Sequence, residues 1–477
     1  MKLKISLVLI SLSAAFSAFE TSKHSSPIQQ QQQQQQGFVI DTIARDLVVP
    51  WQIVFLPDGT MLFTEREGRL RIYRDGKLAP KPAIVFQNVP LNNKSGLLGM
   101  CVHPDFPKNN FIYLAHNYAQ GNAMKLRVMR YQFKNDSLTD PKTIFENIPA
   151  NRNHTGCRLI FGPDKKLYVS TGDADQPAMS QDLKAYNGKI LRVNDDGTVP
   201  PDNPFVKTDS ARKEIWSYGH RNPQGLAFQP GTNDLYSSEH GPTGGDEINR
   251  IRKGMNYGWP VIHHQESKEG MVSPLVQYTP SVGPSEAMFY RGEKFPDLTG
   301  KLLVACLRGE SILVLSPEKD SITSQQIFLK KQYGRIRSLV TGPDGNIYFS
   351  TSQIDPAEGK GGPPFDMILR MRPVGGNLRL ESVTTTTPQI AVRKPTTENL
   401  IQQLCGSCHG NDLNGTARAK GLIGNNLTYG RDGGAIIKNI SNGIPEKGMP
   451  AWKGAISDDD IDKIAQFIVS RRIVVGK

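Results

Sequence analysis

Two cysteines and a histidine lie close together near the C-terminus, in the stretch LCGSCHG. They are Cys405, Cys408 and His409, and this C-x-x-C-H spacing is typical of c-type haem attachment, in which two thiols bond to the haem and the imidazole binds the iron. A redox dithiol or half of a zinc site could also contain C-x-x-C. The immediate histidine, with no second cysteine pair and no later histidine, disfavours both. The motif therefore predicts covalent haem.

Met449 is the single methionine after His409 and is the predicted second axial ligand of that iron. An electron-carrying haem needs two axial ligands, and a thioether raises the reduction potential because it is soft and uncharged. Lone methionines more often fill gaps in a core. However, Met449 lies in the irregular loop NGIPEKGMPAWKG, at the distance from C-x-x-C-H where small cytochromes c carry their ligand.

A histidine and an aspartate in the middle of the chain could form a general base. In NRNHTGCRLIFGPDKKLYVSTGDAD, His154 precedes an expected strand and Asp173 follows the returning strand, so a tight hairpin would bring both to one end. A carboxylate that accepts one imidazole N–H fixes the tautomer and raises the basicity of the other nitrogen. A loop histidine is more often structural, but the expected pairing makes catalysis an equal alternative.

Arginines stand at or near several expected hairpin ends: Arg221, Arg308, Arg335 and Arg337. Guanidinium groups that converge on one site bind carboxylates bidentately. Scattered arginines are usually surface salt-bridge partners. Arg335 and Arg337, however, are alternate residues of an extended segment and would project together.

The elements that must position these residues follow from an internal repeat. Six segments each contain a short apolar strand, a turn built on proline with Asp or Gly, and a second strand rich in Tyr, Phe, Val and Leu, which is a hairpin pattern. The turn prolines are Pro57, Pro104, Pro163, Pro230, Pro296 and Pro343. Coincidental turns in a pair of β-sandwiches are the alternative. The regular spacing favours an all-β six-bladed propeller, whose loops wall a funnel suited to a flat cofactor and a sugar-sized substrate.

The residues from 396 to the end resemble a class I cytochrome c, a small all-α domain. The first helix is expected to run into Cys405. The stretch ISDDDIDKIAQFIVSRR predicts the last helix, with Ser457 as its N-cap and an acidic first turn that suits the helix dipole. Its apolar face is expected to contain Ile461, Ile464, Ala465 and Ile468.

The larger segment resembles the soluble quinoprotein glucose and aldose sugar dehydrogenases, the glucose/sorbosone dehydrogenase family. The motifs that carry the resemblance are GHRNPQG, EHGPTGGDEIN, NYGWP, RIR before GPDGNIY, and HPDF, and it covers residues 40–372. It implies a six-bladed propeller that holds pyrroloquinoline quinone (PQQ) with calcium. The fold expected from the repeats and the fold implied by the family agree.

The resemblance also implies roles for individual residues. His154 would take the proton of the anomeric hydroxyl while the hydride passes to PQQ, and Asp173 would orient this base. Arg221 would polarise the quinone, and Asn222 would bind its oxygens. Further cofactor contacts would come from Arg308, Arg335 and Arg337, and calcium would bind the backbone carbonyls of Gly241 and Pro242. Departures from the family at Lys94, Asn153 and around Thr279 weaken the expectation of glucose more than that of PQQ.

The N-terminal residues indicate an exported protein. Two lysines, an apolar run and small residues near Ser17 predict a signal peptide, with retention as a membrane anchor as the alternative. The predicted organisation is a signal peptide at 1–17, a Gln-rich linker at 18–37, the propeller at 38–375, a Thr/Pro-rich linker at 376–395 and the cytochrome c domain at 396–477. Export to the periplasm or the medium agrees with haem attachment and leaves no transmembrane helix after cleavage.

The formal charge of +12 does not by itself indicate nucleic-acid binding, because the basic residues are scattered without a Lys/Arg block. An anionic cofactor or an acidic redox partner explains the excess better. The remaining cysteines, Cys101, Cys157 and Cys306, are expected to be buried free thiols.

Together these observations predict a quinohaemoprotein dehydrogenase. It would oxidise an aldose at the anomeric carbon to the lactone, with PQQ as hydride acceptor and Ca²⁺ as its metal. Electrons would leave one at a time through haem c to an external acceptor such as a cytochrome or respiratory-chain component. The alternatives are a PQQ dehydrogenase for another alcohol or a sorbosone-like substrate, and a non-catalytic sugar-binding propeller with a cytochrome tail.

Overall fold

The structure is a computed structural model that describes most of residues 37–473. Outside the described residues lie 1–36, 92–93, 354–364, 376–377, 384–396, 474–477 and short stretches of the C-terminal domain: 406–408, 411, 417–418, 424–426, 431, 445–446, 448, 450 and 454–457. The predicted signal peptide, nearly all of the Gln-rich linker, Cys408 and Ser457 are therefore not described.

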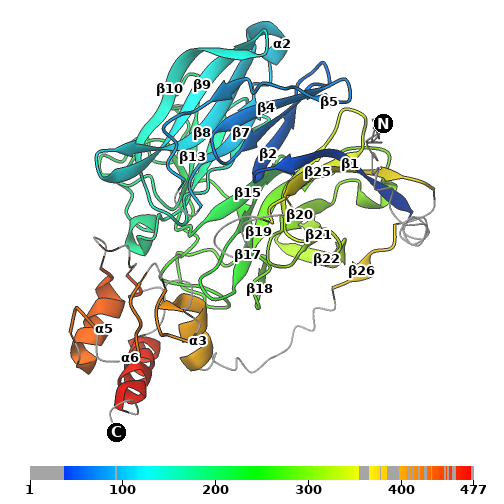
Figure 1. Cartoon of the computed structure of the whole chain (residues 1–477). Coiled ribbons are helices and arrows are strands. Elements are labelled where there is room, and N and C mark those ends of the chain that lie inside the picture. The colour runs from blue at the N-terminus through cyan, green and yellow to red at the C-terminus, as the bar shows by residue number, and fades with distance from the viewer. Residues whose placement is uncertain are drawn as a thin grey trace, which may run out of the picture.

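Six antiparallel β-sheets form the larger domain, which is a six-bladed β-propeller as predicted (Figure 1). Blade 1 contains β2 (Pro50–Phe55), β3 (Met61–Glu65), β4 (Arg69–Arg74), β5 (Lys77–Leu78) and β6 (Ile84–Val85). Blade 2 contains β7 (Leu97–Val102), helix α2 (Phe106–Asn109), β8 (Phe111–Gln120), β9 (Ala123–Lys134) and β10 (Ser137–Ala150). Blade 3 contains β11 (Leu159–Phe161), β12 (Leu167–Thr171), the 3-10 turn η1 (Pro177–Ser180), β13 (Lys189–Val193) and β14 (Ile215–Tyr218).

The other three blades have the same plan. Blade 4 contains β15 (Pro223–Phe228), β16 (Leu235–Glu239), β17 (Asp246–Ile251) and β18 (Val276–Tyr278). Blade 5 contains β19 (Pro284–Phe289), the 3-10 turn η2 (Pro296–Leu298), β20 (Leu302–Cys306), β21 (Ser311–Glu318), β22 (Ser321–Phe328) and β26 (Glu381–Ser382). Blade 6 contains β23 (Ile336–Thr341), β24 (Ile347–Thr351), β25 (Asp366–Pro373) and β1 (Phe38–Leu47).

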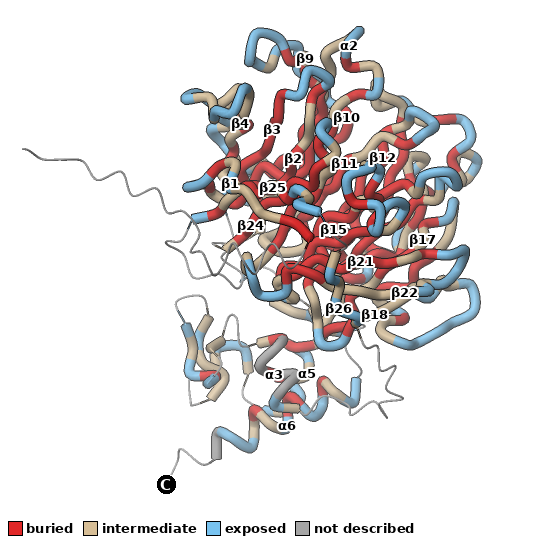
Figure 2. The backbone as a smooth tube through the Cα atoms, turned by 90° about the vertical axis from the view of Figure 1, so that its right-hand side faces the viewer, coloured by how far each residue is buried: buried red, intermediate tan, exposed pale blue. Residues whose placement is uncertain are grey.

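The predicted hairpins are the first hairpins of the blades. Each of the six turn prolines lies between the first and second strands of its own blade, so that prediction is confirmed. The first strands of neighbouring blades pack against one another around the axis. Second strands such as β3 and β20 are buried throughout, because neighbouring blades cover both of their faces. Figure 2 shows this burial for β3. Their near-continuous apolar sequences follow from this double burial.

The ring is closed by the N-terminal strand. β1 pairs antiparallel with β25, with Phe38 opposite Pro373 and Leu47 opposite Asp366. Blade 6 therefore combines the first strand of the domain with its last three, so the domain cannot close until both ends of the propeller sequence are present.

A buried ion pair crosses the axis of the propeller. Arg158 on β11 lies 3.1 Å from Glu286 on β19, and Gln52 on β2 donates to the same carboxylate oxygen at 3.2 Å. Buried charges of this kind need several partners, and these come from blades 1, 3 and 5. The network ties alternate blades together below the funnel.

Part of the segment expected to be a linker packs on the propeller. β26 pairs antiparallel with β22, with Glu381 opposite Ile327. Leu378 and Leu380 also pack against the buried cluster between blades 5 and 6. The low-complexity composition of residues 376–395 did not indicate this short pairing.

A separate C-terminal domain lies beside the propeller in both views, and three helices are described in it (Figures 1 and 2). They are α3 (Thr397–Leu404), α5 (Gly433–Asn442) and α6 (Asp458–Ile473). The predicted apolar face of the last helix is confirmed, since all four of its residues are buried: Ile461, Ile464, Ala465 and Ile468. α3 runs into Cys405 as expected: the helix ends at Leu404, and the N–H of Cys405 donates to the Ile401 carbonyl at 2.8 Å. No helix within the described part of the chain is long and apolar enough to cross a membrane.

Candidate active site

His154 and Asp173 meet at one end of blade 3. His154 precedes β11 and Asp173 follows β12, and the β11–β12 hairpin brings the two loops together. The Nδ1 of His154 lies 2.7 Å from the Oδ1 of Asp173. Because an ionised carboxylate only accepts hydrogen bonds, Nδ1 carries a proton, and in the neutral ring Nε2 then has the lone pair. The expected pairing is therefore present in a geometry that leaves Nε2 able to act as a base.

Gly172 permits this close approach of the two loops. A Cβ at Gly172 would lie 2.1 Å from the backbone oxygen of His154, a distance that no side chain tolerates. The N–H of Ala174 donates to that same oxygen at 3.3 Å, and the N–H of Asp173 donates to the Arg221 carbonyl at 2.8 Å. The backbone of blade 3 is thus joined to the next blade at the position of the carboxylate.

Trp259 is a third member of this arrangement that the residue-by-residue sequence reasoning missed. Its indole N–H donates to the Oδ2 of Asp173 at 2.9 Å, and both side chains are buried. Burial alone would raise the pKa of Asp173, but the neighbouring His154, Arg221 and Trp259 hold that pKa below its usual value. The motif NYGWP contained the signal, although nothing in it indicated which residue the indole would contact.

Arg221 and Asn222 are held from behind by a buried carboxylate. The Oε1 of Glu239 accepts the backbone N–H of Arg221 and, at 3.3 Å, that of Asn222. Its Oε2 lies 3.0 Å from the Nδ1 of His220. The guanidinium of Arg221 contacts the His240 carbonyl at 3.3 Å, while its Nε is buried without a hydrogen-bond partner in the described structure. A buried donor left in this state indicates a missing acceptor.

The other predicted arginines divide into two groups. Arg335 and Arg337 share one neighbour, since their Nε atoms donate to the Ser352 carbonyl at 3.1 Å and to the Ser352 hydroxyl at 3.0 Å. Arg308 follows β20 at the same end of the propeller. Burial lowers the pKa of His240 well below its usual value, and nearby cations add to that effect: Lys94, Arg221 and Arg308.

These segments meet at a depression that we name the funnel floor. It is lined by Trp51, Arg66, Lys94, His154, Thr155, Gly156, Asn222, Gln224, His240, Leu307 and Arg337. The Trp51 ring is contacted by the Arg158 guanidinium at 4.3 Å and by that of Arg337 at 5.9 Å. Sequence reasoning did not select Trp51, Arg66 or His240. His240, in the motif EHGPTGGDEIN, was the only one with a signal next to it.

The predicted calcium ligands lie in a tight loop after β16. The N–H of Gly241 donates to the Oδ1 of Asp246 at 3.0 Å, and Gly244 and Gly245 have φ of +97° and +65°. No described backbone N–H donates to the carbonyl oxygens of Gly241 or Pro242. Both oxygens therefore remain available to a hard cation. The described residues contain no group of three or more His, Cys, Asp or Glu side chains placed to hold a metal.

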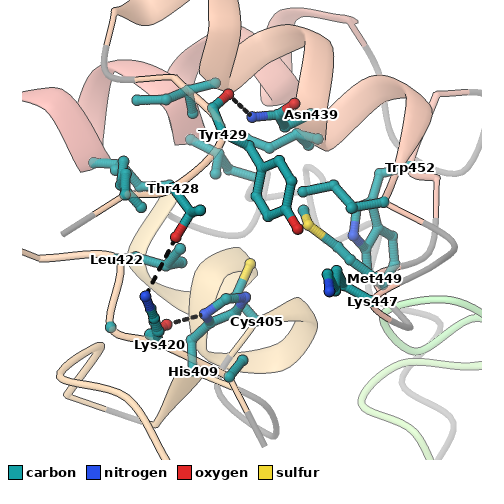
Figure 3. Close-up of a pocket in the computed structure, with 18 of the residues that line it drawn as sticks. Cys405, His409, Lys420, Leu422, Thr428, Tyr429, Asn439, Lys447, Met449 and Trp452 are labelled. Atoms are coloured by element: carbon teal, nitrogen blue, oxygen red, sulfur yellow. Dashed lines mark hydrogen bonds between the residues drawn. The ribbon is translucent and has the colours of Figure 1, made fainter.

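A second cavity, which we name the C-terminal cavity, measures ≈ 490 Å³ and is lined by Cys405, His409 and Met449 (Figure 3). Apolar side chains such as Leu404, Ile440 and Trp452 form much of its wall. The Nδ1 of His409 donates to the Lys420 carbonyl at 2.6 Å, which leaves Nε2 free to bind a metal. Cys405 and His409 of the haem motif and the predicted axial ligand Met449 thus line one apolar cavity. Cys408 lies outside the described residues.

Comparison with known proteins agrees with a propeller followed by a cytochrome c domain. Residues 47–359 match the family described as Glucose / Sorbosone dehydrogenase, and residues 394–468 match the family described as Cytochrome C oxidase, cbb3-type, subunit III. The aldose sugar dehydrogenase YliI of Escherichia coli is 36% identical over 333 residues, which cover 66% of this chain and 90% of that protein. Quinoprotein glucose dehydrogenase B of Acinetobacter calcoaceticus is 28% identical over 421 residues, covering 68% and 87%. The PQQ-bound aldose sugar dehydrogenase of Streptomyces coelicolor has a TM-score of 0.61 and 30% identity, covering 71% of this chain and 98% of that one.

Proposed function

The chain belongs to the glucose/sorbosone dehydrogenase family and carries a cytochrome c domain, and on this premise we propose that it oxidises an aldose at the anomeric carbon to the lactone. The electrons leave one at a time through haem c. The observation that carries the proposal is the 2.7 Å contact between His154 and Asp173 at the edge of the funnel floor. With Nδ1 protonated, the Nε2 of His154 can remove a hydroxyl proton. The clustered arginines beside it suit the binding of an anionic cofactor.

His154 acts as the general base. Its Nε2 takes the proton of the anomeric hydroxyl as the C–H bond breaks, and Asp173 stabilises the imidazolium that results. PQQ, when bound, would supply the acceptor for the hydride that leaves the anomeric carbon. The positive charge of Arg221 stabilises negative charge that develops on the acceptor oxygens. Trp259 keeps the carboxylate of Asp173 oriented while the proton moves.

The donor set of the funnel suits PQQ, a flat cofactor with three carboxylates. Arg337 lines the floor and Arg335 shares its Ser352 partner, while the buried Nε of Arg221 is unpaired within the described residues. Arg308 adds a further cation, Asn222 a polar contact, and the Gly241 and Pro242 carbonyls would hold Ca²⁺. The space enclosed at the floor is only ≈ 20 Å³, so the flat cofactor would rest on the floor in the open funnel above.

The C-terminal cavity suits haem c. His409 and Met449 would bind the iron, Cys405 and Cys408 would form the thioether bonds, and the apolar wall of the cavity would keep water from the haem, which supplies one-electron transfer. The external acceptor of the electrons is a cytochrome or a respiratory-chain component. The N-terminal pattern supports export to the periplasm or the medium.

The decisive experiment supplies PQQ and calcium to purified protein that lacks them and records the haem absorption bands with a panel of sugars. We expect haem reduction by aldoses only when both are present, and loss of that reduction on chelation. Recovery with a nicotinamide cofactor instead would contradict the proposal. Tight PQQ binding without oxidation of any sugar or alcohol would favour the non-catalytic alternative.

A further inference from the structure

One residue of the propeller lines the C-terminal cavity. Among the described residues around that cavity, all belong to the C-terminal domain except Arg152. Arg152 is half-buried and lies in the loop that connects β10 of blade 2 to β11 of blade 3. The two domains therefore share this cavity, although they are far apart in the sequence.

The loop that carries Arg152 also carries the catalytic base. Arg152 precedes His154 by two residues, and its carbonyl accepts the N–H of Lys94 at 2.9 Å. Lys94 and His154 both line the funnel floor. A single short loop thus borders the funnel floor at His154 and the C-terminal cavity at Arg152.

The charge around the cavity is suited to the edge of a haem. A haem has an apolar ring and two propionate carboxylates on one edge. The wall near Ile440 and Trp452 is apolar, while the cations are Arg152, Lys420 and Lys447, of which both lysines are exposed. Arginine is the residue that binds a carboxylate through two parallel N–H bonds, whereas a lysine offers a compact point charge.

We propose that the Arg152 guanidinium binds a haem propionate and thereby docks the cytochrome domain at the mouth of the funnel. This inference rests on the haem binding given under the proposed function. The propeller then completes the haem site of its own C-terminal domain, and the propionate edge of the haem faces the loop of the general base. The Thr/Pro-rich segment keeps the haem domain close, and Arg152 fixes its orientation.

The test compares the haem midpoint potential of the holoprotein with those of Arg152→Gln, Arg152→Lys and Arg372→Gln, all without sugar or quinone. Arg372 lies on blade 6, where it pairs with Asp41 at 2.8 Å. Arg372→Gln is the control, because it also removes an arginine charge but at a site outside the C-terminal cavity. A cation beside a propionate favours the reduced haem, so Arg152→Gln should lower the potential. Arg152→Lys should lie between it and the parent, and Arg372→Gln should match the parent.

Salt and kinetics give two further readouts. Added salt screens an exposed charge pair, so it should move the parent potential toward that of Arg152→Gln. With sugar, PQQ and calcium present, the rate of haem reduction divided by the rate of dye reduction should be roughly tenfold lower in Arg152→Gln than in the parent. This is the effect expected for the loss of one charge-assisted hydrogen bond. A potential for Arg152→Gln equal to that of Arg372→Gln would overturn the docking contact. Absence of sugar-driven dye reduction in the parent would instead overturn the proposed function. The measurement of the haem potential uses neither sugar nor quinone, so it tests the docking contact separately.

Discussion

Trp259 donates its indole N–H to the Oδ2 of Asp173 at 2.9 Å, while the Oδ1 of the same carboxylate contacts the Nδ1 of His154 at 2.7 Å. The tryptophan and the aspartate are 86 positions apart in the sequence. With both oxygens engaged, the carboxylate cannot rotate away from the imidazole. Trp259 is therefore expected to be a positioning residue for the proposed base, acting through Asp173.

Replacing Trp259 by Phe should lower kcat by roughly tenfold, the effect of losing one hydrogen bond to a charged group. The N–H helps to hold the pKa of Asp173 below its usual value, so its loss should raise that pKa and move the acidic limb of the kcat profile to higher pH. The pH profile of sugar-dependent dye reduction measures both effects. Trp216→Phe, at the outer strand β14, is the control and should keep the parental profile.

The same lowered pKa has a consequence for stability. A carboxyl group whose pKa is lower in the folded protein stabilises the fold above its unfolded pKa of about 4 and loses that contribution as the pH falls through the folded value. Trp259→Phe should therefore lose less stability than the parent on acidification below about pH 4. Urea unfolding at several acidic pH values tests this. Parallel curves for the two proteins would show that the indole does not influence the Asp173 carboxylate.

Replacing His154 by Ala removes the proposed base and should lower sugar oxidation by roughly two to four powers of ten. PQQ binding should survive, because the contacts proposed for the cofactor carboxylates are with arginines and not with His154. Dye-linked kinetics and titration with PQQ measure the two properties separately. Oxidation at the parental rate would remove His154 from the mechanism.

Ending the chain before Thr396 should leave sugar-driven reduction of small dyes nearly intact and abolish reduction of a cytochrome acceptor. Hydride transfer needs only the funnel, whereas delivery of single electrons to a large partner needs the haem edge. The match to the aldose sugar dehydrogenase YliI spans 66% of this chain and 90% of that protein, so we expect the propeller to fold without the cytochrome domain. A truncated protein that binds PQQ but reduces no dye would contradict the assignment of sugar oxidation to the propeller alone.

Haem should remain attached after denaturation, because the C-x-x-C-H spacing predicts thioether bonds from Cys405 and Cys408. Gels stained for haem peroxidase activity should show a band, and release of haem into acid acetone would contradict attachment. Met449→Ala should keep the haem but lose the sulfur-to-iron charge-transfer band of the oxidised form. Retention of that band would exclude Met449 as the axial ligand.

Replacing Lys189 by Met should destabilise the propeller by about 3 kcal/mol, because buried carbonyls would lose their donor. The Lys189 ammonium is buried and donates to the carbonyls of Met179, Ser180 and Asn187 at 2.7, 3.0 and 2.7 Å. These carbonyls shape the loop between β12 and β13, next to Asp173. Urea unfolding measures the loss, and the exposed neighbour Lys184→Met should be close to neutral. Equal stability of the two variants would contradict a structural role for the ammonium.

Short-range patterns in the sequence were enough to predict the elements and the local pairs. The turn prolines indicated the first hairpin of every blade, and hairpin geometry brought His154 to Asp173, because the two residues flank adjacent strands. The apolar spacing of Ile461, Ile464, Ala465 and Ile468 likewise fixed the buried face of the last helix. β26 was missed because a two-residue pairing leaves no periodic signal in a Thr/Pro-rich segment.

The sequence by itself determined the haem motif, the repeat that builds a propeller and the pair of residues predicted to form a general base. The tertiary structure alone decided which distant residues support that chemistry. Trp259 reaches Asp173, and Glu239 holds the amide of Arg221, only after neighbouring blades pack around the axis. Arg152 lines the C-terminal cavity only because the two domains meet there. Spacing along the chain encodes strands, turns and helices, whereas contacts between blades and domains depend on how the ring closes and what packs against it.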